Sequence, residues 1–347
     1  MLSHPVVHPR SLSLLGTIVL VVCLAALLAG PALAAAPTTL TATLDHQVIT
    51  YPGRAVVSGT ISVPGADLSL LARPAGAADY SPAASGKAGA DGAFSFRVKP
   101  PVSTDYEVVF AATSTQEAAQ ADVSLHVRPL VTASFPRSLW LGGSVTLRGA
   151  VEPAHAGGTV LIDRRVAGVW QQFASTTLDA ASAFAYRWTP DTFGFYRLRA
   201  RMAADADHYG GSSASGLVIV NRPNAHHVPL RYAHFIVIVR HEYRLYYYEH
   251  GALVRRFDVA LGRPGFRTPL GYYHIYGKIK PAGGALGACA MFYRHQGGIA
   301  IHGTNEPWLL SRPIPRDFSH GCARMHNSQA LWLYARVPVG THVHNLR

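Results

Sequence analysis

Ser319-His320-Gly321-Cys322-Ala323-Arg324 is the most informative segment of this 347-residue chain. Its single cysteine follows a histidine and a glycine, and a second histidine opens the run His302-Gly303-Thr304 upstream. The thiolate is the nucleophilic form of cysteine, and a neighbouring imidazole favours it at neutral pH. We therefore expect Cys322 to be an activated nucleophile, and the segment predicts covalent acyl chemistry.

Two structural alternatives compete with this interpretation. In the first, Cys322 is a buried structural thiol and His302 is a core histidine. In the second, zinc is bound by His302, His320, Cys322 and His326. The zinc alternative lacks a recognised ligand spacing, and zinc would consume the thiolate. We predict no metal and no organic cofactor.

The N-terminal residues 1–34 read as an export signal. Arg10 precedes an uncharged run from Leu14 to Leu28, and Ala32-Leu33-Ala34 provides a small-residue cleavage site. We expect an exported protein located in the cell wall or at the outer face of the cytoplasmic membrane. An uncleaved anchor is the alternative, because residues 14–36 carry no charge and are long enough to span a bilayer. The membrane is a partner only in that case.

Cysteine usage after the signal is sparse. Removal of residues 1–34 takes Cys23 away and leaves Cys289 and Cys322, which do not form a disulfide framework for a chain of this length. Cys289 is expected to be a small buried residue. Its pairing with Cys322 remains an alternative, as a redox switch that would silence the nucleophile.

Positive charge is concentrated in the C-terminal part. Residues 35–224 contain 15 Lys and Arg against 14 Asp and Glu, whereas residues 225–347 contain 15 against 5, which is +10 of the total +12. Basic surfaces also suit nucleic acid. An exported protein does not meet nucleic acid, so we expect an anionic cell-wall polymer as the partner of the basic domain.

Residues 37–222 contain an internal duplication at an offset of 90 residues. Short alternating runs such as Ala93 to Val98 and Phe184 to Trp188, with frequent turn residues, predict antiparallel strands that are buried on one face. Each copy resembles an immunoglobulin-like β-sandwich, over 37–129 and 130–222. We expect them to act as a spacer or a wall-binding stalk. The matched pairs are Gly59 and Gly149, Phe94 and Phe184, Pro100 and Pro190, and Tyr106 and Tyr196.

The C-terminal domain, residues 231–347, is also predicted to be rich in strands, and residues 223–230 are expected to form a solvated linker. Phe235 to Val239, Arg244 to Tyr248 and Val254 to Leu261 have strand patterns. A helix is predicted over Gln329 to Arg336 with Ser328 as its N-cap. The predicted fold is therefore all-β and multidomain, with one or two short helices in the last domain.

The ordered motifs of this domain resemble the catalytic domain of YkuD-type L,D-transpeptidases. The His-Gly-Cys segment is the specific part of the resemblance, which covers about Tyr232 to Leu346. Ala323 departs from the larger aliphatic residue that is common there, which bears on local packing. The motifs are Leu245-Tyr246-Tyr247-Tyr248, Thr268-Pro269-Leu270-Gly271, Ile301-His302-Gly303-Thr304, Ser319 to Met325, and Gly340-Thr341-His342-Val343.

The resemblance assigns a role to each matched residue. It implies that Cys322 attacks, that His302 takes its proton and that the Gly303 carbonyl orients the imidazole. His320, Gly321 and Cys322 would supply N–H groups to the oxyanion. Arg324 is expected to hold a substrate carboxylate or brace the loop. Substrate contacts are also expected from Ser319, Trp308 and Tyr293, with residues 283–287 as a wall or lid.

The resemblance also implies a reaction on peptidoglycan stem peptides, as donor and acceptor. Cys322 would form a thioester with the third residue of a donor stem and release D-alanine, and an amine of an acceptor stem would resolve it as a 3-3 cross-link. Hydrolysis of the same thioester, which gives an L,D-carboxypeptidase, stays open. A sortase lacks support because its Thr-Leu-x-Thr-Cys run is absent. A non-enzymatic wall-binding protein is the alternative from another class.

Overall fold

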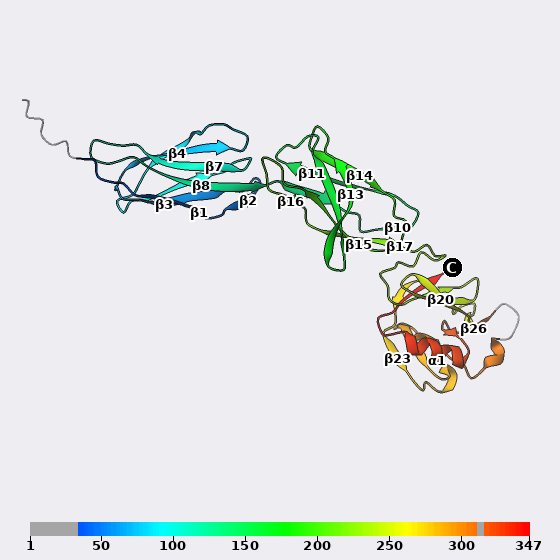
Figure 1. Ribbon diagram of the computed structural model, residues 1–347. Helices are drawn as coiled ribbons and strands as arrows, with labels where there is room; N and C mark the ends of the chain where they lie inside the picture. The colour runs from blue at the N-terminus through cyan, green and yellow to red at the C-terminus, as the bar shows by residue number, and fades with distance from the viewer. Residues whose placement is uncertain (1–33, 311–315) are drawn as a thin grey trace, which may run out of the picture.

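The computed structural model describes residues 34–310 and 316–347, and strands dominate it (Figure 1). The export signal predicted over residues 1–34 therefore lies, but for its last residue, outside the described residues. Within the described part, no helix has the length and apolar character needed to cross a membrane. The prediction of an all-β, multidomain chain is confirmed.

The first sandwich has a three-stranded sheet in the order β1-β3-β6 and a five-stranded sheet in the order β2-β8-β7-β4-β5. Alternating side chains of both sheets, among them Val57, Leu70 and Val108, are fully buried in one shared core. The strands are β1 Leu40–Leu44, β2 Val48–Thr50, β3 Ala55–Ile61, β4 Asp67–Pro74, β5 Ser81–Lys87, β6 Ala93–Val98, β7 Thr104–Phe110 and β8 Ala119–Arg128.

The second sandwich repeats this strand order. Its sheets run β9-β11-β14 and β10-β17-β15-β12-β13, with β16 added to β15. In both copies the short second strand pairs in parallel with the last one. The duplication is thus visible in topology, while the immunoglobulin-like type stays a prediction. The strands are β9 Leu130–Ser134, β10 Ser138–Trp140, β11 Val145–Glu152, β12 Thr159–Val166, β13 Val169–Thr177, β14 Ala183–Trp188, β15 Gly194–Met202, β16 Gly211–Ser212 and β17 Gly216–Asn221.

The matched residues Gly59 and Gly149 are glycines for the same structural reason. Gly59 faces Phe94, and Gly149 faces Phe184, across their sheets. A Cβ on Gly59 would lie 1.8 Å from the Thr41 carbonyl oxygen, and a Cβ on Gly149 would lie 2.0 Å from the corresponding oxygen of the next strand. Each glycine therefore leaves room for a phenylalanine ring that crosses over it.

The linker over residues 223–230 is packed, which corrects the expectation of a solvated hinge. Val228 and Leu230 are buried, and Val228 joins a small core with Phe235. The Leu230 N–H donates to the side chain of Asn221 at the end of β17. Apolar residues at 228 and 230 fill a gap beside the last domain, so the proline-rich composition does not make this segment solvated.

The C-terminal domain contains a five-stranded sheet, β20-β19-β18-β28-β22, a four-stranded sheet, β23-β24-β25-β27, and the pair β21-β26. Its core lies between the sheets and the single α-helix of the described residues. The strands are β18 Phe235–Val239, β19 Arg244–Glu249, β20 Ala252–Asp258, β21 Leu261–Gly262, β22 Gly271–His274, β23 Gly277–Ile279, β24 Ala290–Arg294, β25 Ile299–His302, β26 Asp317–Ser319, β27 Ala323–Arg324 and β28 His342–Leu346.

Helix α1 spans Asn327–Arg336 and packs against β24 and β25, behind the Cys322 segment. It starts earlier than predicted, with His326 at the N-cap, and Ser328 lies inside the first turn. Asn327 is the reason, since its side-chain oxygen accepts the Ala288 N–H and ties the start of the helix to the neighbouring loop. Two short 3-10 helices, η1 Gly284–Leu286 and η2 Pro307–Leu309, complete the domain.

Candidate active site

Parallel pairing of β25 with β27 brings the predicted nucleophile and base to one sheet. Ile301 is the partner of Ala323, and His302 is the partner of Arg324. Ile301 and Ala323 point into the core and are fully buried. Because side chains alternate along a strand, Cys322, His302 and Arg324 project from the opposite face. Cys322 and His302, twenty residues apart in the sequence, thus lie on neighbouring segments and only two positions apart in the strand register.

The Cys322 side chain is partly buried between this sheet and solvent. Its Sγ accepts the Ala300 N–H at 3.4 Å and lies 4.0 Å from the Gly298 carbonyl oxygen. Burial raises the pKa of the thiol, although the Ala300 N–H and the positive charge of Arg324 act in the other direction. The thiol is therefore the resting form at neutral pH.

The His302 ring is almost fully buried, at 2% exposure, and its Nδ1 lies 2.5 Å from the Gly303 carbonyl oxygen. A carbonyl only accepts, so Nδ1 carries the hydrogen and Nε2 presents its lone pair. Burial lowers the pKa of His302 to about 4, and the positive charge of Arg324 lowers it further. The hydrogen bond to the Gly303 carbonyl acts in the other direction, because it favours the protonated ring. The orientation by Gly303 agrees with the role predicted for it.

These two pKa directions run against the expectation of a thiolate at neutral pH. A thiolate–imidazolium pair needs a low thiol pKa and a high imidazole pKa, and both shifts have the opposite sign. Within the described residues, Cys322 Sγ makes no hydrogen bond to the His302 ring. The resting site holds a neutral thiol and a neutral imidazole, so proton transfer has to accompany the attack.

The loop before the nucleophile is held by Ser319, which is fully buried. Its Oγ accepts the Gly321 N–H at 3.0 Å and donates to the Cys322 carbonyl at 2.7 Å. Ser319 is therefore a clamp inside the loop, which corrects its predicted role in contacting substrate. The Gly321 N–H is used by this clamp, whereas those of His320 and Cys322 have no acceptor within residues 34–310 and 316–347.

Gly321 and His320 shape the outer side of the same loop. Gly321 has φ +120°, and a Cβ there would lie 2.7 Å from Ile299 Cδ1, so other residues are strained and crowded at this position. The exposed His320 ring accepts a hydrogen bond from Arg263 at 2.7 Å and stacks edge-on against Phe266. The His320 side chain is engaged by Arg263 and Phe266, so the role predicted for this residue rests on its main-chain N–H.

Arg324 contacts Glu306 through an N···O distance of 3.3 Å. The guanidinium is mostly covered, and its Nε has no hydrogen-bond partner within the described residues. Glu306 was missed by the sequence reasoning. The sequence feature that could have indicated Glu306 is that it is the one acidic residue between Asp258 and Asp317 in a basic domain.

The predicted substrate-contact residues divide into two groups. Trp308, in η2, is 55% exposed, whereas Tyr293 is buried in the domain core and its hydroxyl oxygen accepts a hydrogen bond from the Asn345 side-chain amide at 3.2 Å. Tyr293 is therefore corrected from wall to core, because β24 turns its ring inward; burial also raises its pKa.

The segment over residues 283–287 lies beside His302. The Asn305 side chain donates to the Gly284 carbonyl at 2.8 Å. The main chain of Leu286 lies close enough to the His302 ring to raise its pKa slightly, against the larger effect of burial. A Cβ on Gly287, at φ +62°, would lie 2.6 Å from the Thr304 nitrogen. Close backbone approach at Gly287 thus brings this segment next to the imidazole, and its role as a wall or lid stays a prediction.

The alternative zinc site at Cys322 is not assembled. Among the described residues, the one group of three or more His, Cys, Asp or Glu side chains close enough to bind a metal lies in the second sandwich: His155, Asp205 and His208. Cys289 and Cys322 are both free thiols, so the two are not paired, and Cys289 is fully buried.

Comparison with known proteins places the C-terminal domain. The L,D-transpeptidase catalytic domain model, YkuD, matches residues 233–344. A protein named as an L,D-transpeptidase YkuD in Bacillus licheniformis is 32% identical over 149 residues, which cover 42% of this chain and 84% of that protein. One named as an L,D-transpeptidase YbiS in Escherichia coli K12 is 28% identical over 155 residues, 37% of this chain and 49% of that protein. The solved L,D-transpeptidase from Mycobacterium smegmatis is 17% identical, with a TM-score of 0.29 over 63% of this chain and 100% of that one. Because the Bacillus licheniformis protein shares this level of identity over most of its length, the chain belongs to the YkuD family of L,D-transpeptidases.

Proposed function

We propose that this protein is a cysteine-dependent L,D-transpeptidase that forms 3-3 cross-links between peptidoglycan stem peptides outside the cytoplasm. The observation that carries the proposal is the parallel pairing of β25 with β27, which sets Cys322, His302 and Arg324 on one face of a sheet. The domain holding them has the basic charge suited to an anionic wall polymer.

In the proposed acylation, Cys322 Sγ attacks the carbonyl of the third residue of a donor stem. Its proton passes to Nε2 of His302, whose Nδ1–H is held by the Gly303 carbonyl. In the resting geometry Sγ contacts the Ala300 N–H, so rotation of the Cys322 side chain precedes transfer. The protonated imidazole then gives the proton to the departing amine of D-alanine, which leaves a thioester on Cys322.

The oxyanion of the tetrahedral intermediate would be stabilised by main-chain donors. The N–H groups of His320 and Cys322 are free of acceptors within the described chain, and Ser319 fixes the loop between them. Loss of one oxyanion donor typically costs on the order of 3 kcal/mol of barrier. Donors already oriented by the fold are suited to this task because they need no rearrangement at the moment of reaction.

Deacylation would use an amine of a second stem. The amine attacks the thioester carbonyl, His302 accepts its proton, and the thiol of Cys322 is regenerated. Transfer to an amine requires limited access of water, and the segment over residues 283–287 and Trp308 are the elements placed to line such a groove.

The test is mass spectrometry of purified disaccharide-tetrapeptides after incubation with the full-length chain. Cross-linked dimers that have lost one D-alanine support the proposal, whereas tripeptides alone identify the hydrolytic alternative. Wild-type protein that binds cell wall but leaves the stems unchanged identifies a non-enzymatic binding protein. Cys322→Ser and Cys322→Ala are the matched controls, and cross-linking that persists in either variant contradicts the mechanism. A carbapenem should add to the wild type and to neither variant, as measured by intact mass.

A further inference from the structure

A cluster outside the catalytic domain, formed by His155, Asp205 and His208, has three ligand-bearing side chains facing one another. His155 Nε2 lies 3.2 Å from His208 Nδ1 and 3.4 Å from Asp205 Oδ2. His208 Nδ1 lies 3.6 Å from the other carboxylate oxygen of Asp205. Both imidazole side chains are more than nine-tenths buried. In tetrahedral zinc sites with bonds of about 2.0–2.1 Å, ligand atoms are about 3.3 Å apart, which matches this spacing.

The outer nitrogens of the two rings show which inner atoms carry lone pairs. His155 Nδ1 lies 2.6 Å from the Pro153 carbonyl oxygen, and His208 Nε2 lies 2.9 Å from the Pro101 carbonyl oxygen. Carbonyls only accept, so both outer nitrogens carry hydrogen, and the inner nitrogens of the neutral rings are acceptors. Hydrogen bonds from the outer N–H to a carbonyl are typical of metal-binding histidines.

The centre of the cluster therefore contains acceptors without a donor. Two imidazole lone pairs and an ionised carboxylate repel one another unless a cation lies between them. A single proton on His155 Nε2 leaves the contact between His208 Nδ1 and Asp205 Oδ1 unfavourable, whereas a metal ion makes all three contacts favourable. We propose that His155, Asp205 and His208 bind a divalent transition metal, zinc above all, at the junction of the two sandwiches.

Local structure holds the three side chains in place before any metal binds. Asp205 Oδ1 accepts the N–H groups of Asp207 at 2.8 Å and His208 at 2.7 Å, which orients the carboxylate. The His155 N–H donates to Ser182 Oγ at 2.7 Å. A cavity of about 360 Å³ reaches Asp205 and His208, and a second of about 330 Å³ reaches His155 and Asp205. Water can therefore complete the coordination.

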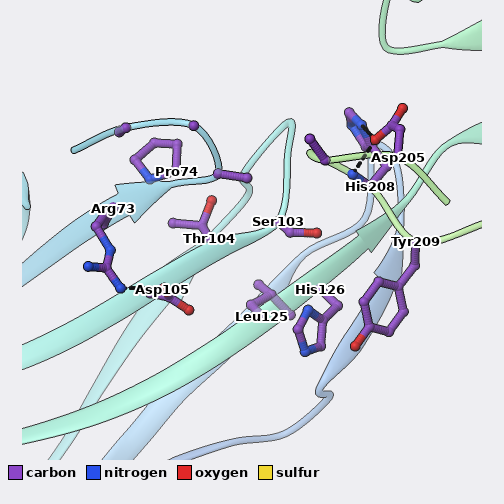
Figure 2. A pocket seen from close by; sticks show the side chains of 14 residues that line it. Arg73, Pro74, Ser103, Thr104, Asp105, Leu125, His126, Asp205, His208 and Tyr209 are labelled. Carbon is purple, nitrogen blue, oxygen red and sulfur yellow. Dashed lines mark hydrogen bonds and ion pairs between the residues drawn. The ribbon is translucent and has the colours of Figure 1, made fainter. Parts of the chain in front are cut away.

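Two of the three ligands, Asp205 and His208, lie in the loop by which the second sandwich contacts the first. Ser103 donates its N–H to the Asp207 carbonyl at 2.8 Å, and Tyr209 donates its N–H to the Val127 carbonyl at 2.8 Å. Figure 2 shows Asp205 beside His208 at the cavity between the sandwiches, with His126 next to Tyr209. A metal bound by this loop would fix the orientation of the two sandwiches, since the His208 ring joins the metal to the Pro101 carbonyl.

The three ligands occur in the second sandwich and have no counterparts at the matching positions of the first. The corresponding turns of the first sandwich, residues 62–66 and 111–118, contain no histidine. The strand order of the two sandwiches is otherwise the same. The ligands thus occur in the copy whose loop meets the other sandwich, which is where a metal would restrict the relative orientation.

The test is zinc binding to the full-length chain, carried out in a Cys322→Ser background so that the catalytic thiol does not compete. His155→Asn and His208→Gln keep an amide near each outer nitrogen and remove the metal-facing atom. His126→Gln is the matched control, because His126 stacks on Tyr209 at the same junction with ring centroids 4.2 Å apart. After removal of metal with a chelator, zinc is titrated by calorimetry and bound zinc is measured by elemental analysis.

We expect His155→Asn and His208→Gln each to lose one equivalent of zinc that the control retains. Zinc should also slow hydrogen exchange at the N–H groups of Ser103 and Tyr209 in the control. Equal stoichiometry in all three proteins overturns the proposal, as does a melting temperature that responds to pH but not to zinc. Asp205→Asn, which keeps the Oδ1 acceptor, provides a third variant should either histidine variant fail to fold, and zinc binding unchanged in it would also refute the site.

Discussion

His302 and Arg324 are direct partners across the parallel pair β25–β27, and the Arg324 charge acts on His302 and on the Cys322 thiol. It disfavours a protonated imidazole and favours a thiolate. The same guanidinium is held by Glu306, with N···O 3.3 Å. Burial is the main cause of the low pKa of His302, and the Arg324 charge adds to it; the same charge partly offsets the cost of ionising Cys322, in addition to any contact with substrate.

Replacing Arg324 by glutamine should raise the pKa of His302 and that of Cys322 together, because one nearby positive charge is removed from both. The two values are measured in the free protein, by NMR titration of the imidazole and by the pH dependence of alkylation. Arg324→Lys is the control and should stay near wild type. Opposite movements of the two pKa values would show that the charge does not act in this way.

The wild-type thiol should react slowly with iodoacetamide at pH 7, and the rate should climb through the alkaline range. Burial raises the pKa of Cys322, so the thiolate is scarce at neutral pH in the absence of substrate. The reaction is followed by intact mass. Cys322→Ser reports background labelling, which should be small in a chain without residues 1–34, because Cys289 is then the one remaining cysteine and is fully buried. A rate that has already reached its plateau below pH 7 is incompatible with the raised pKa.

Removing the Ser319 hydroxyl should lower both stability and turnover. Ser319→Ala leaves the buried Gly321 N–H without its acceptor, which costs about 1–3 kcal/mol, and it frees the loop that carries the His320 and Cys322 N–H groups. Thermal unfolding and steady-state kinetics measure the two effects. Ser328→Ala, an exposed serine in the first turn of α1, is the control and should change neither. A fully active Ser319→Ala would remove the clamp from the mechanism.

Local patterns predicted the sheets and the main site residues because their signals are short in range. Alternation predicted β6 and β14, a continuous apolar run predicted β18, and the Ser319 to Arg324 segment predicted the nucleophile. What the sequence did not predict depends on contacts between distant segments. The burial of Tyr293, the Ser319 clamp and the packing of Val228 in the linker arise from such contacts.

The pKa directions were also beyond sequence reasoning. A Cys–His pair in a sequence indicates an activated thiol, but the direction of each pKa shift depends on burial. His302 is only 2% exposed, and burial is the largest cause of its low pKa. The cluster of His155, Asp205 and His208 was not predicted for a related reason. Its members lie in two loops some fifty residues apart in a region where sequence patterns indicated only a spacer.

The repeated glycines offer a paired test of the sandwich duplication. Gly59→Ala and Gly149→Ala each place a methyl group about 2 Å from a facing carbonyl oxygen and should destabilise their sandwiches by a similar amount, about 1–3 kcal/mol or more. Calorimetry of each variant reads the transition of its own sandwich, and the other sandwich serves as the internal control. A silent Gly149→Ala beside a damaging Gly59→Ala would show that the two positions are not equivalent.

The buried His302 should make the C-terminal domain less stable in acid. Its pKa is about 4 in the folded protein and about 6.5 when unfolded, so between these values the unfolded chain binds more protons and stability rises with pH. The contribution is fully present above about pH 6.5 and is lost as pH falls through about 4, a change of about 3 kcal/mol. Hydrogen exchange of the β25 amides between pH 7 and pH 4, corrected for intrinsic rates, measures it. His302→Asn, which keeps an amide near Nδ1, should flatten this dependence relative to the wild type, and the difference between the two proteins cancels the effects of the other histidines. Parallel curves for the two proteins would mean that His302 titrates alike in the folded and unfolded states, and the neutral buried base would have to be abandoned.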